Sequence, residues 1–131
     1  MGSGTGIGRV RGLGSAKSGV HHWWLQRVTA VGNLLLVLWF LVSLLRLPNL
    51  GYKLVFAWLH SPLASVPMLL LVVSTFWHFR LGLQVFIEDY VHEEGSKVAA
   101  LIALNFYVIA GAALAIFSIL RIAFAPLGVA G

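Results

Sequence analysis

Three long runs of apolar residues, separated by short polar or turn-forming segments, set the pattern of this chain. They predict membrane-spanning helices over about residues 26–47, 66–88 and 98–124, because about 20 consecutive apolar residues are needed to cross the hydrocarbon core of a bilayer. Tryptophans and basic residues lie near the ends of the first run, where such side chains reach the lipid headgroups. We therefore predict an all-α membrane protein with a three-helix transmembrane domain over residues 19–131.

The segments outside the three runs differ in character. Residues 1–18 are rich in glycine and serine and contain three basic residues, which predicts a flexible basic tail. Residues 52–60 are apolar and aromatic but too short to cross a membrane, so we expect them to lie at the interface. Residues 88–97 are polar and contain all of the acidic side chains of the chain. This acidic segment connects the second and third predicted spans.

The distribution of basic residues predicts how the helices are oriented. Three spans place the two ends of the chain on opposite sides of the membrane. Arg9, Arg11, Lys17 and Arg27 precede or begin the first span, so the positive-inside rule favours an N-terminus in the cytoplasm, or in the matrix of a mitochondrion. The acidic segment would lie on that same side. We place the protein in the bacterial inner membrane, with the mitochondrial inner membrane as the alternative.

Composition narrows the possible chemistry. Hydrophobic residues make up 60% of the chain and charged residues 10%, whereas a soluble domain has about 25% charged residues. The chain has no cysteine, which excludes a disulfide framework, a thiolate zinc site and a cysteine-ligated iron–sulfur cluster. The formal charge of +5 does not indicate nucleic-acid binding, because the basic residues are scattered and no soluble recognition domain is predicted.

His78 lies inside the second predicted span, and ionisable residues at such positions usually have a function. At about 100° per residue, Ser74, His78, Gly82, Val85 and Asp89 fall on one stripe of the helix. A neutral imidazole is a common axial ligand of b-type haem, and a planar group or another helix can approach closely at Gly82. The alternative is a contact between helices in which His78 is hydrogen-bonded to its neighbour. The stripe alone does not decide between these two interpretations.

Haem ligation by His78 would require a second subunit. One histidine provides only one of two axial ligands, and no other histidine lies deep inside a predicted span. Three helices are also few to enclose a haem. If His78 binds haem, the chain is therefore part of an obligate hetero-oligomer.

Two segments of the chain resemble the signature motifs of the hydrophobic membrane anchor subunit of succinate dehydrogenase, respiratory complex II. One motif is a histidine followed by a glycine four residues on and by Asp-Tyr at eleven and twelve, which here are His78, Gly82 and Asp89-Tyr90. The other precedes the first span and reads Gly-Val-His-x-x-x-x-x-Arg-x-Thr-Ala, which matches residues 19–30. Both motifs are in register with the three-span layout, and together they cover about a fifth of the chain.

The resemblance implies roles for five residues. His78 would be one axial ligand of haem b, with the other supplied by a partner cytochrome b subunit. Arg27 and His21 match family residues near the haem propionates, where a guanidinium can bind a carboxylate through two N–H groups. Tyr90 would donate a hydrogen bond to a ubiquinone carbonyl, and Asp89 would support that tyrosine or help deliver protons.

Taken alone, four of these side chains have simpler interpretations, and the resemblance reverses that preference. Arg27 would be an anchor that reaches the headgroups, Asp89 a helix-end carboxylate, Tyr90 an interfacial tyrosine and His21 a solvated histidine. Arg80 matches no family role. It could reach toward the headgroups, or meet a carboxylate from a partner helix or a haem propionate.

The resemblance also implies the partners and the reaction. The chain would pair with a cytochrome b556-type large anchor subunit, share haem b with it, and dock an iron–sulfur subunit that receives electrons from a flavoprotein subunit oxidising succinate. The complex would reduce ubiquinone to ubiquinol, and this chain would hold no catalytic residue of its own. Two alternatives remain: a fumarate reductase anchor that uses menaquinone, and a haem-free structural subunit or proton-path component with His78 in the path.

Overall fold

The computed structural model describes residues 17–126, which form four helices and no strand within that range. The helices are α2 (Lys17–Leu45), α3 (Tyr52–His60), α4 (Pro62–Tyr90) and α5 (Glu94–Ala123). Three of them, α2, α4 and α5, are long and apolar enough to cross a membrane, which confirms the predicted all-α, three-span fold. The predicted basic tail falls mostly on residues 1–16, which lie outside the described residues.

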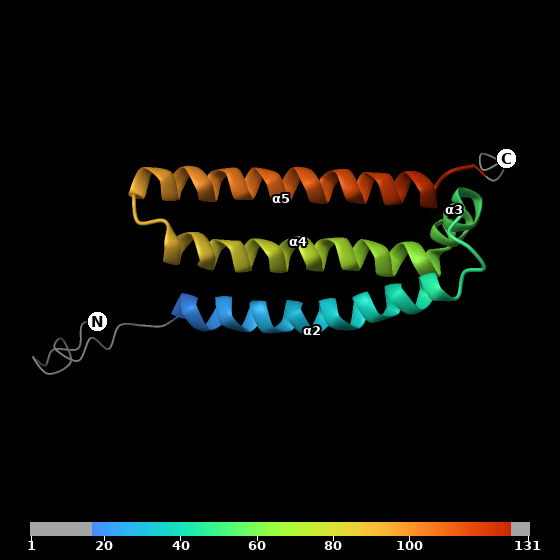
Figure 1. Ribbon diagram of the computed structural model, residues 1–131, viewed down its shortest axis with the longest axis horizontal. Coiled ribbons are helices and arrows are strands. Elements are labelled where there is room, and N and C mark those ends of the chain that lie inside the picture. The colour runs from blue at the N-terminus through green and yellow to red at the C-terminus, as the bar shows by residue number, and fades with distance from the viewer. Residues whose placement is uncertain (1–16, 127–131) are drawn as a thin grey trace, which may run out of the picture.

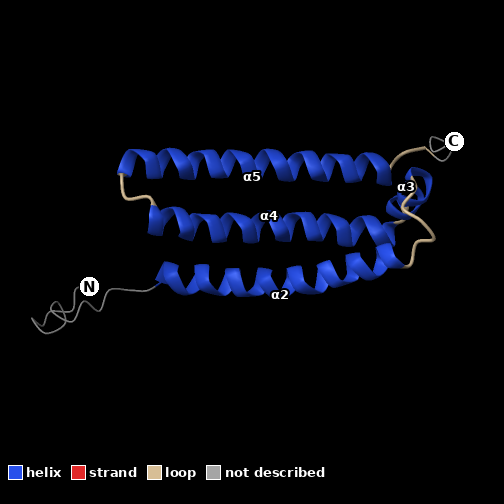
Figure 2. Cartoon of the chain, in the orientation of Figure 1, coloured by secondary structure: helices blue, strands red, loops and turns tan. Residues whose placement is uncertain are grey.

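The three long helices lie side by side, with α4 between α2 and α5 (Figure 1). α2 and α5 run in the same direction, and α4 runs in the opposite one. The short α3 lies across the end of the bundle where α4 begins and α5 ends (Figure 2). The start of α2, the end of α4 and the start of α5 therefore share the other end of the bundle.

Local sequence explains where α4 and α5 begin. α4 starts with Pro62, a residue whose fixed φ and missing N–H suit the first helical position. Pro67 lies inside the helix, which membrane helices tolerate because neighbouring groups satisfy the freed carbonyl. α5 follows Glu93, whose carboxylate accepts hydrogen bonds from the backbone N–H groups of Gly95 and Ser96 at 3.1 Å and 2.8 Å. These bonds cap the helix, since its first N–H groups have no partner within the helix.

The segment from Tyr52 to His60 forms α3, which is held by aromatic and hydrogen-bond contacts at the end of the bundle. Trp58 stacks on Trp39 of α2, with ring centroids 6.0 Å apart. The Nδ1–H of His60 donates to the carbonyl oxygen of Ile122 in α5, at 2.9 Å. α3 thereby ties the end of α2 to the end of α5.

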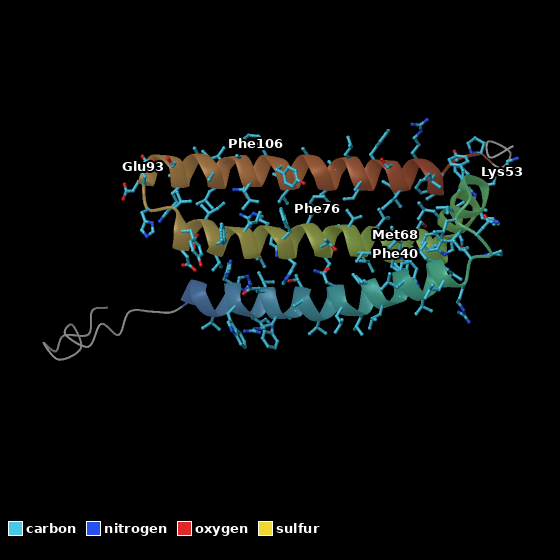
Figure 3. All side chains as sticks on the ribbon, viewed as in Figure 1. Phe40, Lys53, Met68, Phe76, Glu93 and Phe106 are labelled. Atoms are coloured by element: carbon cyan, nitrogen blue, oxygen red, sulfur yellow. The ribbon has the colours of Figure 1, made fainter. Side chains whose placement is uncertain are left out.

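The bundle has a thin core and an apolar outside. Its buried apolar residues are Leu59, Ala64, Leu81, Leu104, Val108 and Ile119. Large apolar side chains are exposed along all three long helices, whereas Lys53 and Glu93 lie at opposite ends of the bundle (Figure 3). Such an outside is suited to contact with lipid or with other membrane subunits rather than with water.

Candidate functional site

His78 lies near the middle of α4, on the side that faces α2. Its Nδ1 atom is 3.1 Å from the Oγ1 atom of Thr29 in α2, and the imidazole is partly buried. The Thr29 hydroxyl also lies 2.8 Å from the carbonyl oxygen of Leu25 and 3.1 Å from that of Gln26. Thr29, which in the sequence only interrupts an apolar run, is therefore the direct partner of the histidine.

This contact belongs to a polar seam between α2 and α4, formed by Thr29, Asn33, Ser74, Thr75 and His78. The Asn33 amide donates to the carbonyl oxygen of Ser74 at 3.5 Å and accepts from the Thr75 hydroxyl at 3.3 Å. Four residues separate Thr29 from Asn33 and, in the opposite direction, His78 from Ser74. The polar side chains therefore meet because the two helices pack antiparallel in this register.

A cavity of about 170 Å³ lies beside the seam and is lined by Gln26, Arg27, Ala30 and His78. Two of the predicted site residues, His78 and Arg27, thus border the same space. The Arg27 guanidinium also lies over the ring of Trp23, 5.2 Å from its centroid, at a distance that gives a cation–π attraction. Pockets that enclose a drug-sized ligand usually measure about 300–1,000 Å³, so this cavity is too small to enclose a porphyrin.

Gly82, one turn beyond His78, leaves the helix face open. A Cβ atom added there would meet no atom within 4 Å, whereas a Cβ at Gly32 in α2 would lie 3.6 Å from the Ser74 hydroxyl oxygen. The two helices are thus in contact at Gly32, and room for a group from outside the chain remains at Gly82. Within residues 17–126 no three His, Asp or Glu side chains gather as a metal site. A haem iron would therefore find only the His78 imidazole as a ligand in this part of the chain, and the rest of its pocket would have to come from another subunit.

The two adjacent histidines near the start of α2 have different surroundings. His21 is exposed and does not line the cavity beside His78. His22 is partly buried, and its Nε2 atom is shielded from solvent without a hydrogen-bond partner in the described part of the chain. His22 lies four residues before Gln26 and seven before Thr29, which places all three on one side of α2. That spacing is the signal in the sequence that could have identified His22 as the inward-facing histidine.

The residues predicted to face quinone, Asp89 and Tyr90, lie at the end of α4. Both are exposed, Tyr90 by 70%, and the Tyr90 ring stacks on Phe86 with centroids 4.6 Å apart. The carbonyl oxygen of Tyr90 accepts a hydrogen bond from Nδ1–H of His92 at 3.1 Å. Tyr90 follows His78 by twelve residues, or about 18 Å along the helix axis. The helix therefore connects the two predicted sites without bringing them into contact.

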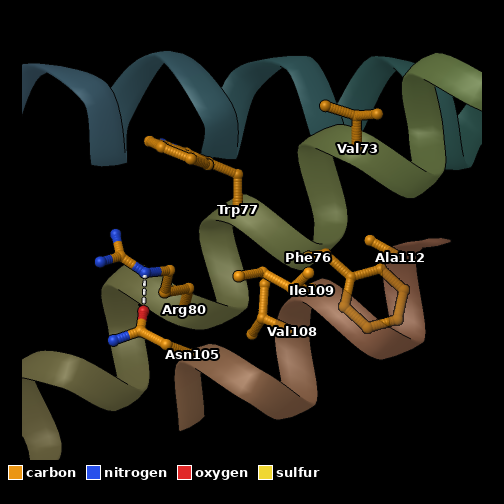
Figure 4. A pocket seen from close by; sticks show the side chains of 8 residues that line it. All are labelled: Val73, Phe76, Trp77, Arg80, Asn105, Val108, Ile109 and Ala112. Atoms are coloured by element: carbon orange, nitrogen blue, oxygen red, sulfur yellow. Dashed lines mark hydrogen bonds between the residues drawn. The ribbon is translucent and has the colours of Figure 1, made fainter. Parts of the chain in front are cut away.

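Arg80 lies on the other side of α4 and faces α5. Its Nε–H donates to the Oδ1 atom of Asn105 at 2.6 Å, and its guanidinium lies 5.6 Å from the centroid of the Trp77 ring. Arg80, Asn105 and Trp77 all border a cavity of about 460 Å³ (Figure 4). The residues that line it are Val73, Phe76, Trp77, Arg80, Asn105, Val108, Ile109 and Ala112. This cavity is the larger of the two, but it is bordered by neither His78 nor Arg27, and Arg80 has a partner within the chain.

Comparison with known proteins identifies the family that the two sequence motifs resemble. The family described as succinate dehydrogenase/fumarate reductase transmembrane subunit matches residues 1–120. The succinate dehydrogenase hydrophobic membrane anchor subunit of Rickettsia bellii is 37% identical over 79% of this chain and 82% of its own length. That of Rickettsia conorii is 35% identical over the same shares, and the succinate dehydrogenase membrane anchor subunit of Reclinomonas americana is 29% identical over 68% of this chain and 77% of its own length. No solved structure matches the chain.

These matches extend over most of the chain and over most of each relative. They are also consistent with the three apolar helices. The chain belongs to the family of succinate dehydrogenase membrane anchor subunits.

Proposed function

We propose that this membrane anchor subunit provides one axial ligand, His78, to a haem b that it shares with a partner subunit, and that Tyr90 and Asp89 form part of the ubiquinone-reduction site. An anchor of succinate dehydrogenase works in a complex with other subunits. We assign as partners a cytochrome b556-type large anchor subunit, an iron–sulfur subunit and a flavoprotein subunit. The second axial ligand would come from the large anchor subunit.

The observation that carries the haem proposal is the space shared by His78 and Arg27. An imidazole and a permanently charged guanidinium border one cavity at the edge of the α2–α4 contact. A haem needs a nitrogen ligand for iron and a cation for its propionates, and these two side chains match both requirements. When bound, the haem provides a one-electron redox centre inside the membrane.

The other residues near this cavity suit the same role. Ala30 has a small side chain, and Gly82 has none, so both leave space for a planar group. His21 lies nearly two turns before Arg27, toward the end of the bundle. We propose that His21 meets a propionate at the membrane surface, with Arg27 binding it nearer the ring.

The quinone proposal rests on the chemistry at the end of α4. Quinone reduction requires two protons as well as two electrons, so it needs acidic groups at the boundary between an apolar pocket and water. Tyr90 has an exposed hydroxyl on a ring that stacks against Phe86, and Asp89 is an exposed carboxylate beside it. Tyr90 would donate a hydrogen bond to a quinone carbonyl, and Asp89 would pass protons from water.

The end of the bundle that contains Tyr90 also contains the start of α2, and this fixes the orientation that we propose for the subunit in the membrane. The start of α2 lies near the end of α4 (Figure 1), so a cytoplasmic N-terminus places Tyr90 on the cytoplasmic side. We propose the bacterial inner membrane, with the mitochondrial inner membrane as the alternative. The relatives named above are succinate dehydrogenase subunits, which favours succinate oxidation over fumarate reduction.

A reduced-minus-oxidised absorption spectrum of the purified complex tests the haem proposal. The parent complex is expected to show a b-type band, and His78→Ala is expected to lose it because the iron loses an axial ligand. The matched control is His92→Ala, which removes an exposed histidine of the α4–α5 turn. A full b-type band in His78→Ala would exclude this residue as the ligand.

Quinone reductase activity tests the proposal that Tyr90 and Asp89 form part of the ubiquinone-reduction site. Tyr90→Phe is expected to lower ubiquinone reduction by roughly 10²–10⁴-fold if its hydroxyl acts in proton transfer, with haem content unchanged. Tyr52→Phe, at the opposite end of the bundle, is the matched control. Parent-like turnover in Tyr90→Phe would argue against a role for this hydroxyl, and loss of haem would show that Tyr90 acts on the fold instead.

A further inference from the structure

We infer that Thr29 is a positioning residue that fixes the tautomer and the ring orientation of His78, so that the lone pair of Nε2 is available to iron. The inference rests on the proposed haem function. It concerns a residue to which the haem proposal assigns no role. Its basis is the pattern of donors and acceptors around the Thr29 hydroxyl.

The Thr29 hydroxyl has one hydrogen, which it can donate to only one acceptor at a time. Its oxygen lies 2.8 Å and 3.1 Å from the carbonyl oxygens of Leu25 and Gln26, and a carbonyl oxygen can only accept. The contact to the carbonyl oxygen of Leu25, at 2.8 Å, is shorter than the contact to Nδ1 of His78, at 3.1 Å, so we assign the hydroxyl hydrogen to the bond within α2. With that assignment the oxygen of Thr29 accepts from His78, and the Nδ1 atom of His78 carries the hydrogen.

A neutral imidazole with its hydrogen on Nδ1 has its lone pair on Nε2. Histidines that bind metals usually donate their other ring N–H to an oxygen acceptor, which orients the ring and makes the ligating nitrogen more basic. Here the acceptor is a hydroxyl that itself donates to a backbone carbonyl. Successive hydrogen bonds of this kind polarise one another, so Thr29 links the His78 imidazole to the backbone of α2.

Neighbouring contacts hold the two side chains at this distance. Gly32, one turn from Thr29, allows α2 to approach Ser74 closely. Asn33 bonds to the backbone of Ser74 and to Thr75 on the same face of α4. Inside a membrane an N–H group without a partner is costly because no water is present to replace it. The seam therefore favours one ring orientation of His78.

The test compares three variants at position 29 in the complete complex. Thr29→Ser keeps the hydroxyl, Thr29→Val keeps the shape without the hydroxyl, and Thr29→Ala removes the hydroxyl without adding apolar bulk. Thr75→Val removes a hydroxyl of the same seam that bonds to Asn33 and not to His78. The readouts are haem content per complex after dilution in detergent and the midpoint potential of the b-type haem from a redox titration.

Thr29→Val and Thr29→Ala are expected to weaken haem retention by roughly 10–100-fold, the usual effect of losing a hydrogen-bond partner of a metal ligand. They should also shift the midpoint potential upward, because a less basic imidazole stabilises ferric iron less. Thr29→Ser should behave like the parent, and Thr75→Val should change both readouts much less than Thr29→Val does. Parent-like retention and potential in both Thr29→Val and Thr29→Ala would overturn the inference.

The two proposals fail in different ways. If His78→Ala keeps its haem band, the proposed haem function fails, and with it the role of Thr29. If His78→Ala loses the band while Thr29→Val matches the parent in both readouts, only the inference about Thr29 fails. A loss of haem in Thr75→Val equal to that in Thr29→Val would also overturn it, since the effect would then come from seam packing and not from the His78 bond.

Discussion

On its α5 side, α4 packs closely at Phe76 and pairs Arg80 with Asn105 beside a cavity of about 460 Å³, whereas on its α2 side it has a polar seam beside a cavity of about 170 Å³. Toward α5, a Cβ atom added at Gly111 would lie 2.7 Å and 2.9 Å from two atoms of the Phe76 ring, so the glycine accommodates that ring. Leu104 and Val108 of α5 are buried. Toward α2, Thr29 and His78 meet next to a small cavity. The comparison indicates that the arginine facing α5 is paired within the chain, whereas the histidine facing α2 borders space that a group from a partner could enter.

The difference also explains the two polar residues deep in α4. His78, beside the seam, has a ring nitrogen not used by Thr29. Arg80 has an acceptor in Asn105 and an aromatic ring at Trp77. An intramembrane arginine whose hydrogen bond is made within the chain helps to join two helices. An intramembrane histidine with a ring nitrogen that no residue in the described part of the chain engages is suited to a ligand.

The largest expected effect comes from filling the space at Gly111. Gly111→Leu would force the Phe76 ring out of its position between α4 and α5, at a cost of about 1–3 kcal/mol. The measurement is the thermal unfolding midpoint and the yield of assembled complex in detergent. Phe76→Ala combined with Gly111→Leu should recover part of the loss. A Gly111→Leu protein as stable as the parent would contradict close packing between Gly111 and the Phe76 ring.

The second prediction tests whether the space beside Gly82 receives a group from outside the chain. Gly82→Leu adds the same bulk on the open face of α4, where a Cβ meets nothing in the chain. We expect the helices of the subunit to stay packed while haem content falls by roughly tenfold, equivalent to about 1.4 kcal/mol. Ala103→Leu, at an exposed position of α5, is the control. Haem content equal to the parent would mean that no group from outside approaches Gly82.

A smaller effect is expected from the bond between Arg80 and Asn105. Asn105→Leu leaves the guanidinium without its acceptor and should cost about 0.6–2 kcal/mol, the range of interhelical hydrogen bonds in membranes. A double-mutant cycle with Arg80→Leu measures the coupling between the two side chains. The haem spectrum should not change in either variant. A shifted spectrum would show that the two faces of α4 are not independent.

The smallest expected effect is on the pH dependence of the first turn of α5. The Ser96 hydroxyl and the backbone N–H groups of Ser96 and Gly95 hold the pKa of Glu93 below its ordinary value of 4.5. Because folding lowers this pKa, the cap contributes fully above pH 4.5 and is lost as the pH falls through the lower folded-state pKa. Hydrogen exchange of the amides of residues 94–97 should therefore speed up in acid.

Two variants check this cap. Glu93→Gln should remove the acid dependence of exchange, since the side chain no longer titrates. Ser96→Ala should move the acid-induced change to higher pH, because the hydroxyl bond of Ser96 is the largest cause of the lowered pKa. An acid dependence that persists unchanged in Glu93→Gln would assign it to another group.

Much of the fold could be predicted because membrane-spanning helices depend on local sequence. In lipid each backbone N–H and C=O group must form its hydrogen bond inside its own helix, so a run of about 20 apolar residues is enough to predict a membrane-spanning helix. The predicted spans correspond to α2, α4 and α5. The seam could not be predicted in the same way. Thr29 and His78 are 49 residues apart, and nothing local fixes which faces of two apolar helices meet.

The sequence by itself determined that this protein spans a membrane with three helices, that it has no thiol ligand, and that His78 and Arg80 are the unusual side chains of the second span. Only the tertiary structure decided that His78 turns toward Thr29 in α2 and Arg80 toward Asn105 in α5. The physical reason is the length scale of each interaction. Hydrophobic length and backbone hydrogen bonding act within one helix, whereas the partner of a polar side chain depends on helix register, which small residues such as Gly32 and Gly111 set by close packing.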